Sequence, residues 1–156
     1  YEICACLVGS EMCIRDSTAA QEVVVNDAYY VDLTSTDTSN LYSYQSLQTV
    51  IAGGGVDVLG ADEMVFENLA QSGAIADLTQ YFSKDELEQL KDYIFYVEDK
   101  DTGDTFAAGI RLGAGSWPVE HGYYDKECIL GIALGSEHKE AAEQMFRYLL
   151  EKSNLD

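Results

Sequence analysis

The hydrophobic and polar positions of this chain follow two periods, one typical of strands and one typical of helices. Residues 21–33 are rich in β-branched and aromatic side chains. Within them Tyr29, Val31 and Leu33 share one face of a period-two pattern. This segment therefore predicts one strand, or two short strands that meet near residues 26–27.

Four further segments have apolar residues at helical spacing, together with residues that start and stop helices. The third shows a capping box, because Ser83 and Glu86 are three positions apart and flanked by Phe82 and Leu87. Glycines at positions 53–55 end the first. We expect helices capped by Asn40, Asp62, Ser83 and Ser136 that end near Ile51, Gly73, Tyr93 and Lys152.

Short apolar runs bounded by glycines or polar turns predict the remaining strands. They cover residues 56–60, 95–98, 105–112 and 128–134, with a polar hairpin turn at 99–104 and a loop at 113–127. Because strands and helices alternate along the chain, we expect an α/β fold: a mostly parallel sheet flanked by helices, with one antiparallel hairpin.

Length and composition agree with one globular domain. The chain has 156 residues, of which 47% are hydrophobic and 24% charged. Only 9 basic residues stand against 28 acidic ones, which gives a net charge of −19 and argues against nucleic acid or anionic membrane surfaces as partners. No apolar run reaches the roughly 18 residues of a membrane-spanning helix.

The first seventeen residues differ from the rest in their cysteines. Cys4, Cys6 and Cys13 lie there, whereas the remainder contains only Cys128. Their spacing fits neither a zinc module nor a disulfide framework. Residues 6–17 resemble a translated sequencing-adaptor junction, so we interpret residues 1–17 as a non-native segment and residues 18–156 as the domain.

Three segments of the domain carry a family resemblance. Residues 47–59 contain a helix end, a glycine turn and an Asp-Val strand start, and residues 69–78 contain a helix end followed by Gly-Ala-Ile-Ala-Asp-Leu. Residues 135–149 contain a Ser cap, an Ala-Ala pair and Phe-x-x-Leu. In this order, with the hairpin 95–112 between them, they resemble the extracytoplasmic solute-binding proteins of ABC importers, which have the type 2 periplasmic-binding fold.

The resemblance implies a single lobe of that fold, because the residues 113–128 are too few to hold the second lobe of two-lobed members. It further implies an extracellular domain attached to the surface of a Gram-positive cell through a missing N-terminal anchor, and a first strand and helix missing before Gln21. The expected partners are a small sugar-like solute and an ABC permease or envelope protein. The alternative is an interaction or scaffold domain that keeps the fold without solute binding.

The candidate ligand site lies where the strand 56–60 meets the following helix. Gly60, Ala61, Asp62 and Glu63 form this turn, and ligands of open α/β sheets bind beyond the carboxyl ends of strands. Carboxylates there can accept hydrogen bonds from sugar hydroxyls, although Asp62 can equally serve only as a helix cap. Two aromatic residues from the loop 113–127, Trp117 and Tyr124, can stack on a sugar face or simply close over the sheet.

The sequence offers little for metal binding or catalysis. Asp99, Asp101 and Asp104 surround Gly103, but their spacing does not match a calcium loop, so we favour a solvated hairpin turn. A metal site from His121 and Asp125 is a weaker alternative because the surrounding residues do not predict a helix.

Cys128 follows two acidic residues at a strand start, which favours a core thiol with a raised pKa. The chain contains neither a Gly-x-Ser-x-Gly nucleophile elbow nor a phosphate-binding glycine loop. We therefore expect no enzyme activity and no cofactor.

Overall fold

A computed structural model describes residues 3–12, 21–153 and 155, with residues 3–12, 21–28 and 30 as backbone only. The first half holds strands, two long helices and a 3-10 turn: β1 (Ile3–Met12), β2 (Gln21–Tyr30), α1 (Thr38–Ala52), β3 (Val58–Ala61), α2 (Glu63–Gln71) and η1 (Leu78–Gln80). The second half holds a hairpin, a last strand and three helices: α3 (Lys84–Gln89), β4 (Ile94–Glu98), β5 (Thr105–Leu112), α4 (Trp117–Glu120), β6 (Cys128–Ile132) and α5 (Lys139–Lys152).

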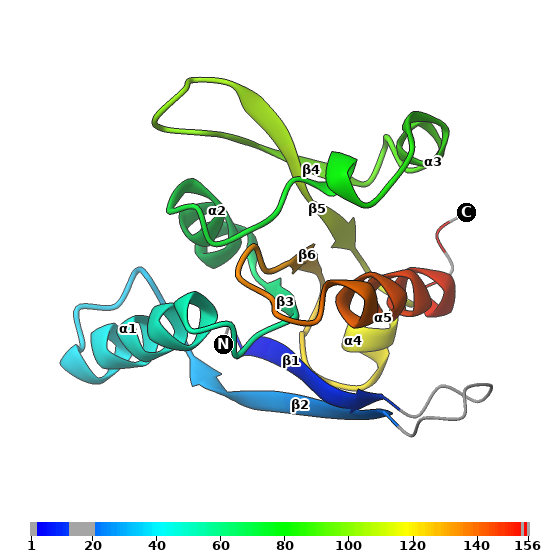
Figure 1. The fold of residues 1–156 in the computed structure, drawn as a ribbon. Coiled ribbons are helices and arrows are strands. Elements are labelled where there is room, and N and C mark those ends of the chain that lie inside the picture. The colour runs from blue at the N-terminus through cyan, green and yellow to red at the C-terminus, as the bar shows by residue number, and fades with distance from the viewer. Residues whose placement is uncertain (1–2, 13–20, 154, 156) are drawn as a thin grey trace.

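The strands of the described residues form one sheet in the order β2-β1-β3-β6-β5-β4, seen edge to edge in Figure 1. Every neighbouring pair is antiparallel. The prediction of a mostly parallel sheet is therefore wrong, although both strands and helices form. The hairpin between β4 and β5 is antiparallel as predicted.

The position of β6 explains the error. Because β6 is antiparallel to both β3 and β5, these two strands point in the same direction. They are not neighbours, however, since β6 lies between them and reverses the direction at the centre of the sheet. The connection from β5 to β6 is a loop with one short helix, so β6 can return beside β5 without a crossover.

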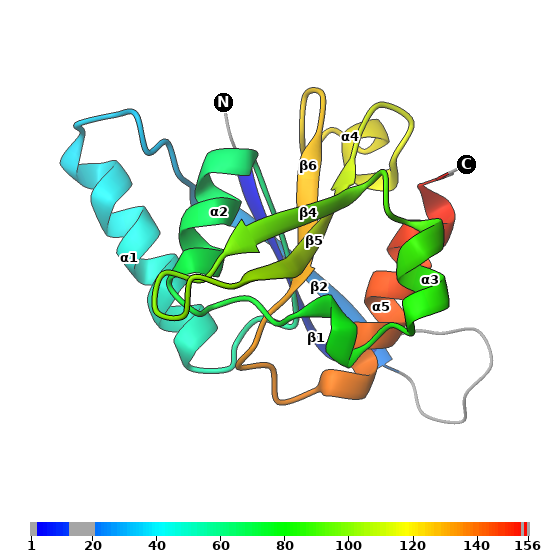
Figure 2. The ribbon, with the colours of Figure 1, turned by 90° about the horizontal axis from the view of Figure 1, so that it is seen from above.

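Helices cover both faces of the sheet (Figure 2). Side chains alternate between the two faces along each strand, so neighbouring residues of β3 enter different clusters, Val58 on one face and Leu59 on the other. The first cluster contains Phe146 and Leu149 of α5, and the second contains Phe66 of α2. The core is therefore a three-layer arrangement of helix, sheet and helix.

Phe66 fills a space that two glycines of the sheet leave open. A Cβ atom placed on Gly109 of β5 would lie 2.7 Å from Phe66 Cζ, and one on Gly131 of β6 would lie 2.6 Å from the same atom. The ring can approach the sheet this closely only because both strands lack a side chain there.

Two of the four helix starts differ from the predicted ones, those of α1 and α5. Asp37, not Asn40, caps α1, and its side chain accepts a hydrogen bond from the backbone N–H of Ser39. Asn40 is buried inside the helix, where its side chain bonds both the N–H and the C=O of Asp32. Asn40 therefore fastens α1 to the chain that leaves β2, a long-range role that a cap pattern does not reveal.

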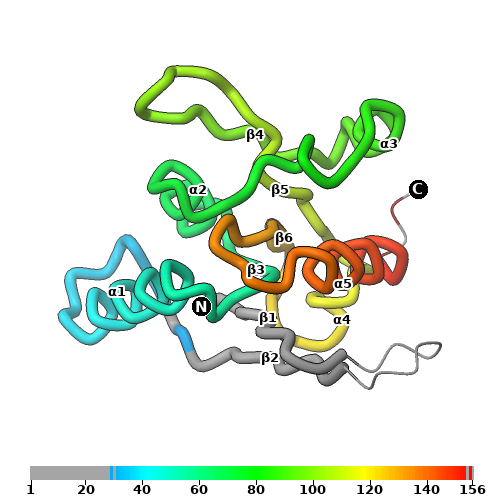
Figure 3. Tube along the Cα trace, viewed as in Figure 1, coloured from blue at the N-terminus to red at the C-terminus, as the bar shows by residue number. Residues whose placement is uncertain are grey.

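The predicted loop 113–127 contains the short helix α4. In Figure 3, α4 lies beside α5, and the backbone N–H of Trp117 donates to Ser153 Oγ at 3.4 Å. Pro118 occupies the first turn of α4, a position that suits proline because the missing N–H has no helical partner there. The region after β5 is thus held against the last helix of the chain.

Candidate functional site

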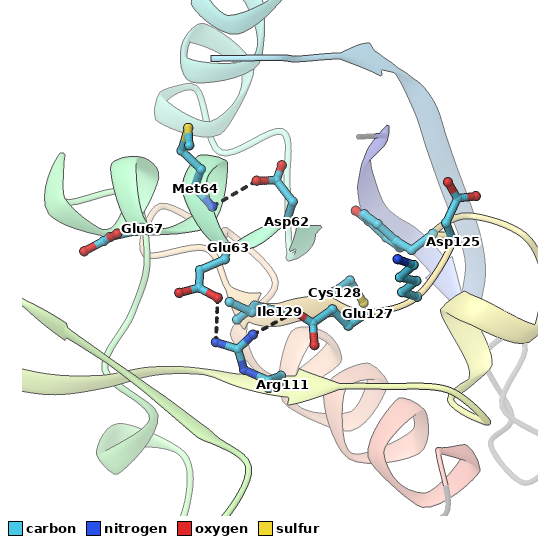
Figure 4. Close-up of a pocket in the computed structure, with 11 residues that line it drawn as sticks. Asp62, Glu63, Met64, Glu67, Arg111, Asp125, Glu127, Cys128 and Ile129 are labelled. Carbon is cyan, nitrogen blue, oxygen red and sulfur yellow. Dashed lines mark hydrogen bonds and ion pairs between the residues drawn. The ribbon is translucent and has the colours of Figure 1, made fainter. Parts of the chain in front are cut away.

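A cavity of about 600 Å³ opens where β3 ends and α2 begins (Figure 4). We call it the β3–α2 cavity. The segment before β6 forms its opposite wall, and Arg111 of β5 lies at its base (Figure 4). It is lined by Asp62, Glu63, Met64, Glu67, Arg111, Tyr124, Asp125, Lys126, Glu127, Cys128 and Ile129.

Asp62 joins the strand to the helix at the edge of this cavity. Its Oδ1 accepts hydrogen bonds from the backbone N–H groups of Met64 at 2.9 Å and Val65 at 3.1 Å. The predicted cap is confirmed, since these are N–H groups that have no partner within the helix. Asp62 thus has a structural role and also lines the cavity.

Arg111 binds two carboxylates from opposite sides. Its Nη2 lies 2.8 Å from Glu63 Oε2, and its Nη1 lies 3.0 Å from Glu127 Oε1. The guanidinium also lies over the ring of Phe95, 5.3 Å from its centroid. All three charged side chains are partly exposed, so the ion pairs add little stability. Their main effect is to fix Glu63 and Glu127 against one cationic group.

Tyr124 forms a buried part of the wall. Its hydroxyl donates a hydrogen bond to the carbonyl of Gly60 in β3. A Cβ atom at Gly60 would lie only 3.3 Å from that hydroxyl, so a glycine lets the tyrosine pack closely. Gly60 and Ala61 are the last residues of β3, directly before Asp62. Their side of the site is fixed by the sheet, because Ala61 pairs with Ile129 of β6.

The structure therefore brings together Gly60, Ala61, Asp62, Glu63 and Tyr124 but leaves out Trp117. The Trp117 ring stacks with that of His121, with ring centroids 4.4 Å apart, and with that of Tyr123, with centroids 5.5 Å apart. It packs against the cluster under α5 and does not line the β3–α2 cavity. Trp117 therefore lies apart from the other predicted site residues, because it packs toward the core from α4.

Arg111 and Glu127 were missed by sequence reasoning. Arg111 lies between Ile110 and Leu112 in a mostly apolar strand, and this is the one local sign that its side chain meets a partner. Its two carboxylate partners come from α2 and from the segment before β6, and these contacts depend on strand order.

Cys128 lies at the start of β6 with its side chain buried. Burial, and to a smaller extent the negative charge of Glu127, raises the pKa of this thiol to about 12. The predicted core thiol with a raised pKa is confirmed. The sulfur is protonated at neutral pH and is a poor nucleophile.

Asp57, Ser136 and His138 meet outside the cavity. Ser136 Oγ donates to Asp57 Oδ1 at 2.5 Å, and His138 Nδ1 lies 3.4 Å from the same oxygen. The serine hydroxyl donates to the carboxylate and not to the imidazole, so these three residues lack the serine–histidine contact of a catalytic triad. Ser136 was predicted to cap α5, but the helix begins after His138 and Ser136 is buried against Asp57.

The acidic turn between β4 and β5 is a hairpin turn, as we favoured. Asp99 Oδ1 accepts hydrogen bonds from the backbone N–H groups of Asp101 at 2.7 Å and Thr102 at 3.2 Å. His121 Nδ1 lies 2.8 Å from the carbonyl of Trp117. In the part of the chain that the structure describes, no three metal-binding side chains gather into a group.

Comparison with known proteins does not place the chain in a family. No family model matches it, and neither a curated protein nor a solved structure is significantly similar to it. Among the described helices, none has the length and apolar character that crossing a bilayer requires.

Proposed function

We propose that this domain is a non-catalytic, extracytoplasmic solute-binding domain associated with an ABC importer, and that the β3–α2 cavity takes a sugar or a related solute. The single observation that carries the proposal is the cavity of about 600 Å³ at the turn where the sequence predicted ligand contacts. Cavities that hold small molecules commonly measure about 300–1,000 Å³.

The chemistry of the lining supports a polar solute. Carboxylates such as Asp125 accept hydrogen bonds from hydroxyl groups, while Met64 and Ile129 offer apolar contact to the carbon face of a sugar ring. The mixture of polar and apolar side chains is what a polyhydroxylated ring requires.

Two buried side chains with nucleophilic atoms, Cys128 and Ser136, support a non-catalytic role. The Cys128 thiol is buried and protonated at neutral pH, and the Ser136 hydroxyl is engaged by Asp57. In a binding domain such groups contribute to packing and to hydrogen bonding, without a reacting partner.

The location and partners follow from the family resemblance and the charge. The proposal places the domain on the cell surface, beside an ABC permease or an envelope protein. The net charge of −19 supports a partner other than nucleic acid.

The test is to block the cavity and measure binding. Met64 lines it and is 47% exposed, so M64W adds bulk at the mouth with little effect on folding. Leu134 is 48% exposed and lies outside the cavity, which makes L134W a matched control. Monosaccharides and oligosaccharides are screened by thermal shift, and their affinities are then measured by calorimetry.

We expect at least one sugar to raise the melting temperature, and M64W to weaken its affinity by about tenfold, or about 1.4 kcal/mol, while L134W leaves it unchanged. If no sugar binds the folded wild-type protein, the proposal fails.

The alternative of an interaction or scaffold domain is favoured by one surface feature. Leu41 and Tyr42 at the start of α1 are 55% and 67% exposed, and exposed apolar side chains of this size are common at protein contacts. In that case L41S/Y42S abolishes capture of an envelope protein while sugars have no effect on the wild type.

A further inference from the structure

We propose that the solute of the β3–α2 cavity carries a positive charge, as an ammonium group on a polyhydroxylated molecule. This inference rests on the proposed function and specifies its ligand class. It follows from the charges that line the cavity and from the way Arg111 is bound.

Acidic side chains dominate the lining. Among the described residues that line the cavity, five carry carboxylates and two, Arg111 and Lys126, are cationic. A hollow lined mainly by one sign of charge concentrates ions of the opposite sign, because the field is focused into the concave space. The whole chain, at −19, adds to this field.

Arg111 does not offset this excess. Both of its terminal nitrogens are engaged, one by Glu63 at 2.8 Å and the other by Glu127 at 3.0 Å. Two carboxylates therefore surround one guanidinium, and the group as a whole keeps a negative charge. An anionic solute would have to break one of these pairs to reach the guanidinium, which disfavours anions.

The remaining carboxylates lie away from this pair. Figure 4 shows Asp62 and Asp125 on the side of the cavity away from Arg111. They belong to different walls, one at the start of α2 and the other in the segment before β6. An ammonium group that enters the cavity would be attracted to the carboxylates of both walls. Because most of these side chains are exposed, each attraction is modest, and the preference arises from their sum.

Different side chains of the lining can contact the charged group of a solute and its carbon skeleton. Met64 and Ile129 are apolar, and the Tyr124 ring is buried with its hydroxyl engaged by Gly60. Apolar atoms of the solute can pack there while its ammonium group meets the carboxylates. Neutral sugars gain the packing and the hydrogen bonds without this attraction.

Three probes with the same ring test the charge of the ligand: glucosamine, glucose and glucuronate, which are cationic, neutral and anionic. Their affinities are measured by calorimetry at about pH 6, where an amine is protonated and ordinary carboxylates are ionised. We expect glucosamine to bind about tenfold more tightly than glucose, and glucuronate more weakly than both. The preference for glucosamine should shrink as salt is added, because salt screens the charges.

Two matched variants locate the effect. D125N removes a carboxylate from the cavity with little change in shape, and D101N removes one from the distant hairpin turn. We expect D125N to weaken glucosamine binding by about threefold to tenfold and glucose binding by less, because the asparagine amide still accepts a hydrogen bond from a hydroxyl but carries no charge. D101N should change neither affinity.

The outcomes separate the two proposals. If glucose or glucuronate binds as tightly as glucosamine, the charge inference is overturned and the solute-binding function stands. If D101N weakens glucosamine as much as D125N does, the attraction comes from the whole molecule and the assignment to the cavity is overturned. If none of the three probes binds the folded protein, both the inference and the proposed function are overturned.

Discussion

At the residue scale, Arg147 of α5 joins three parts of the structure. Its Nη1 lies 2.6 Å from Glu86 Oε1, its Nε lies 2.9 Å from Glu143 Oε1, and its Nη2 donates to the carbonyl of Tyr81 at 2.9 Å. The guanidinium also lies over Phe82, 4.3 Å from the ring centroid. One side chain therefore links α5 to α3 and to the turn between η1 and α3.

The charge of Glu86 makes this contact sensitive to acid. Hydrogen bonds from the side chain of Arg147, and then from the backbone and side chain of Ser83, lower the pKa of Glu86 to about 2. Because the folded value lies below the ordinary value of 4.5, the ionised carboxylate stabilises the fold above about pH 4.5. That contribution is lost as the pH falls toward 2.

We therefore expect E86Q to be less stable than the wild type at neutral pH, and the difference to shrink between about pH 4.5 and about pH 2. Urea denaturation at a series of pH values measures it. D85N removes a charge in the same turn of α3 and serves as the control. A difference between E86Q and wild type that stays constant down to the lowest pH would contradict the assignment.

Whether the role of a residue could be predicted from the sequence depends on how many positions separate it from its partner. Asp62 and the Ser83–Glu86 capping box bond groups two or three positions away, so a local pattern predicted both. Arg111 meets Glu63 across 48 positions and Arg147 meets Glu86 across 61. No local pattern encodes such pairs, because they form only once the sheet order is fixed.

At the element scale, α2 packs on β5 and β6 through Phe66, and the sheet accepts the ring because of its two glycines. A methyl group on Gly109 would lie 2.7 Å from Phe66 Cζ and 2.7 Å from the backbone oxygen of Leu130. The backbone oxygen cannot rotate away, so either the strand or the helix must move.

We expect G109A to lower the free energy of unfolding by about 1–3 kcal/mol, the usual cost of adding atoms to a filled core. G113A is the matched control, since a methyl group there meets nothing within 4 Å. Chemical denaturation of both variants measures the difference. Equal stability of G109A and the wild type would show that α2 shifts freely on the sheet.

The predicted elements agree with the structure more closely in position than in their ends. The inward residues of α2 were predicted correctly, and Val65, Phe66, Leu69 and Ala70 are all buried. The helix predicted after Ser83 ends at Gln89, earlier than expected, and Ser136 does not cap α5. Helix ends depend on which tertiary contacts capture the polar groups, whereas a buried face is visible in the spacing.

At the scale of the whole molecule, the direction of the strands was the main feature that the sequence did not reveal. Alternating strands and helices predict that β3 and the next strand, β4, run the same way. In the structure β4 runs opposite to β3, because β4 is antiparallel to β5 and β6 enters between β3 and β5. Sheet order is a choice among long-range pairings whose apolar patterns look alike. Every one of these strands can satisfy the same alternation of faces in either direction.

The net charge of −19 is also a property of the whole molecule, and it weakens the folded state by self-repulsion. We expect an increase in NaCl from about 0.02 M to about 0.5 M to stabilise the fold by about 1 kcal/mol, or about 3 °C in Tm. Thermal unfolding in NaCl and in KCl measures this. An equal rise in both salts indicates screening, and a fall in Tm would mean that ion pairs such as Arg147–Glu86 outweigh the repulsion.

The place of β6 at the centre of the sheet has a consequence for folding during synthesis. Val58 of β3 pairs with Ile132 of β6. Because β6 is made late, one edge of β3 has no partner until the ribosome has made most of the chain. The β4–β5 hairpin closes a short loop and can form earlier. A nascent or shortened chain that ends before Cys128 therefore exposes an apolar strand edge, where it is open to pairing with another copy.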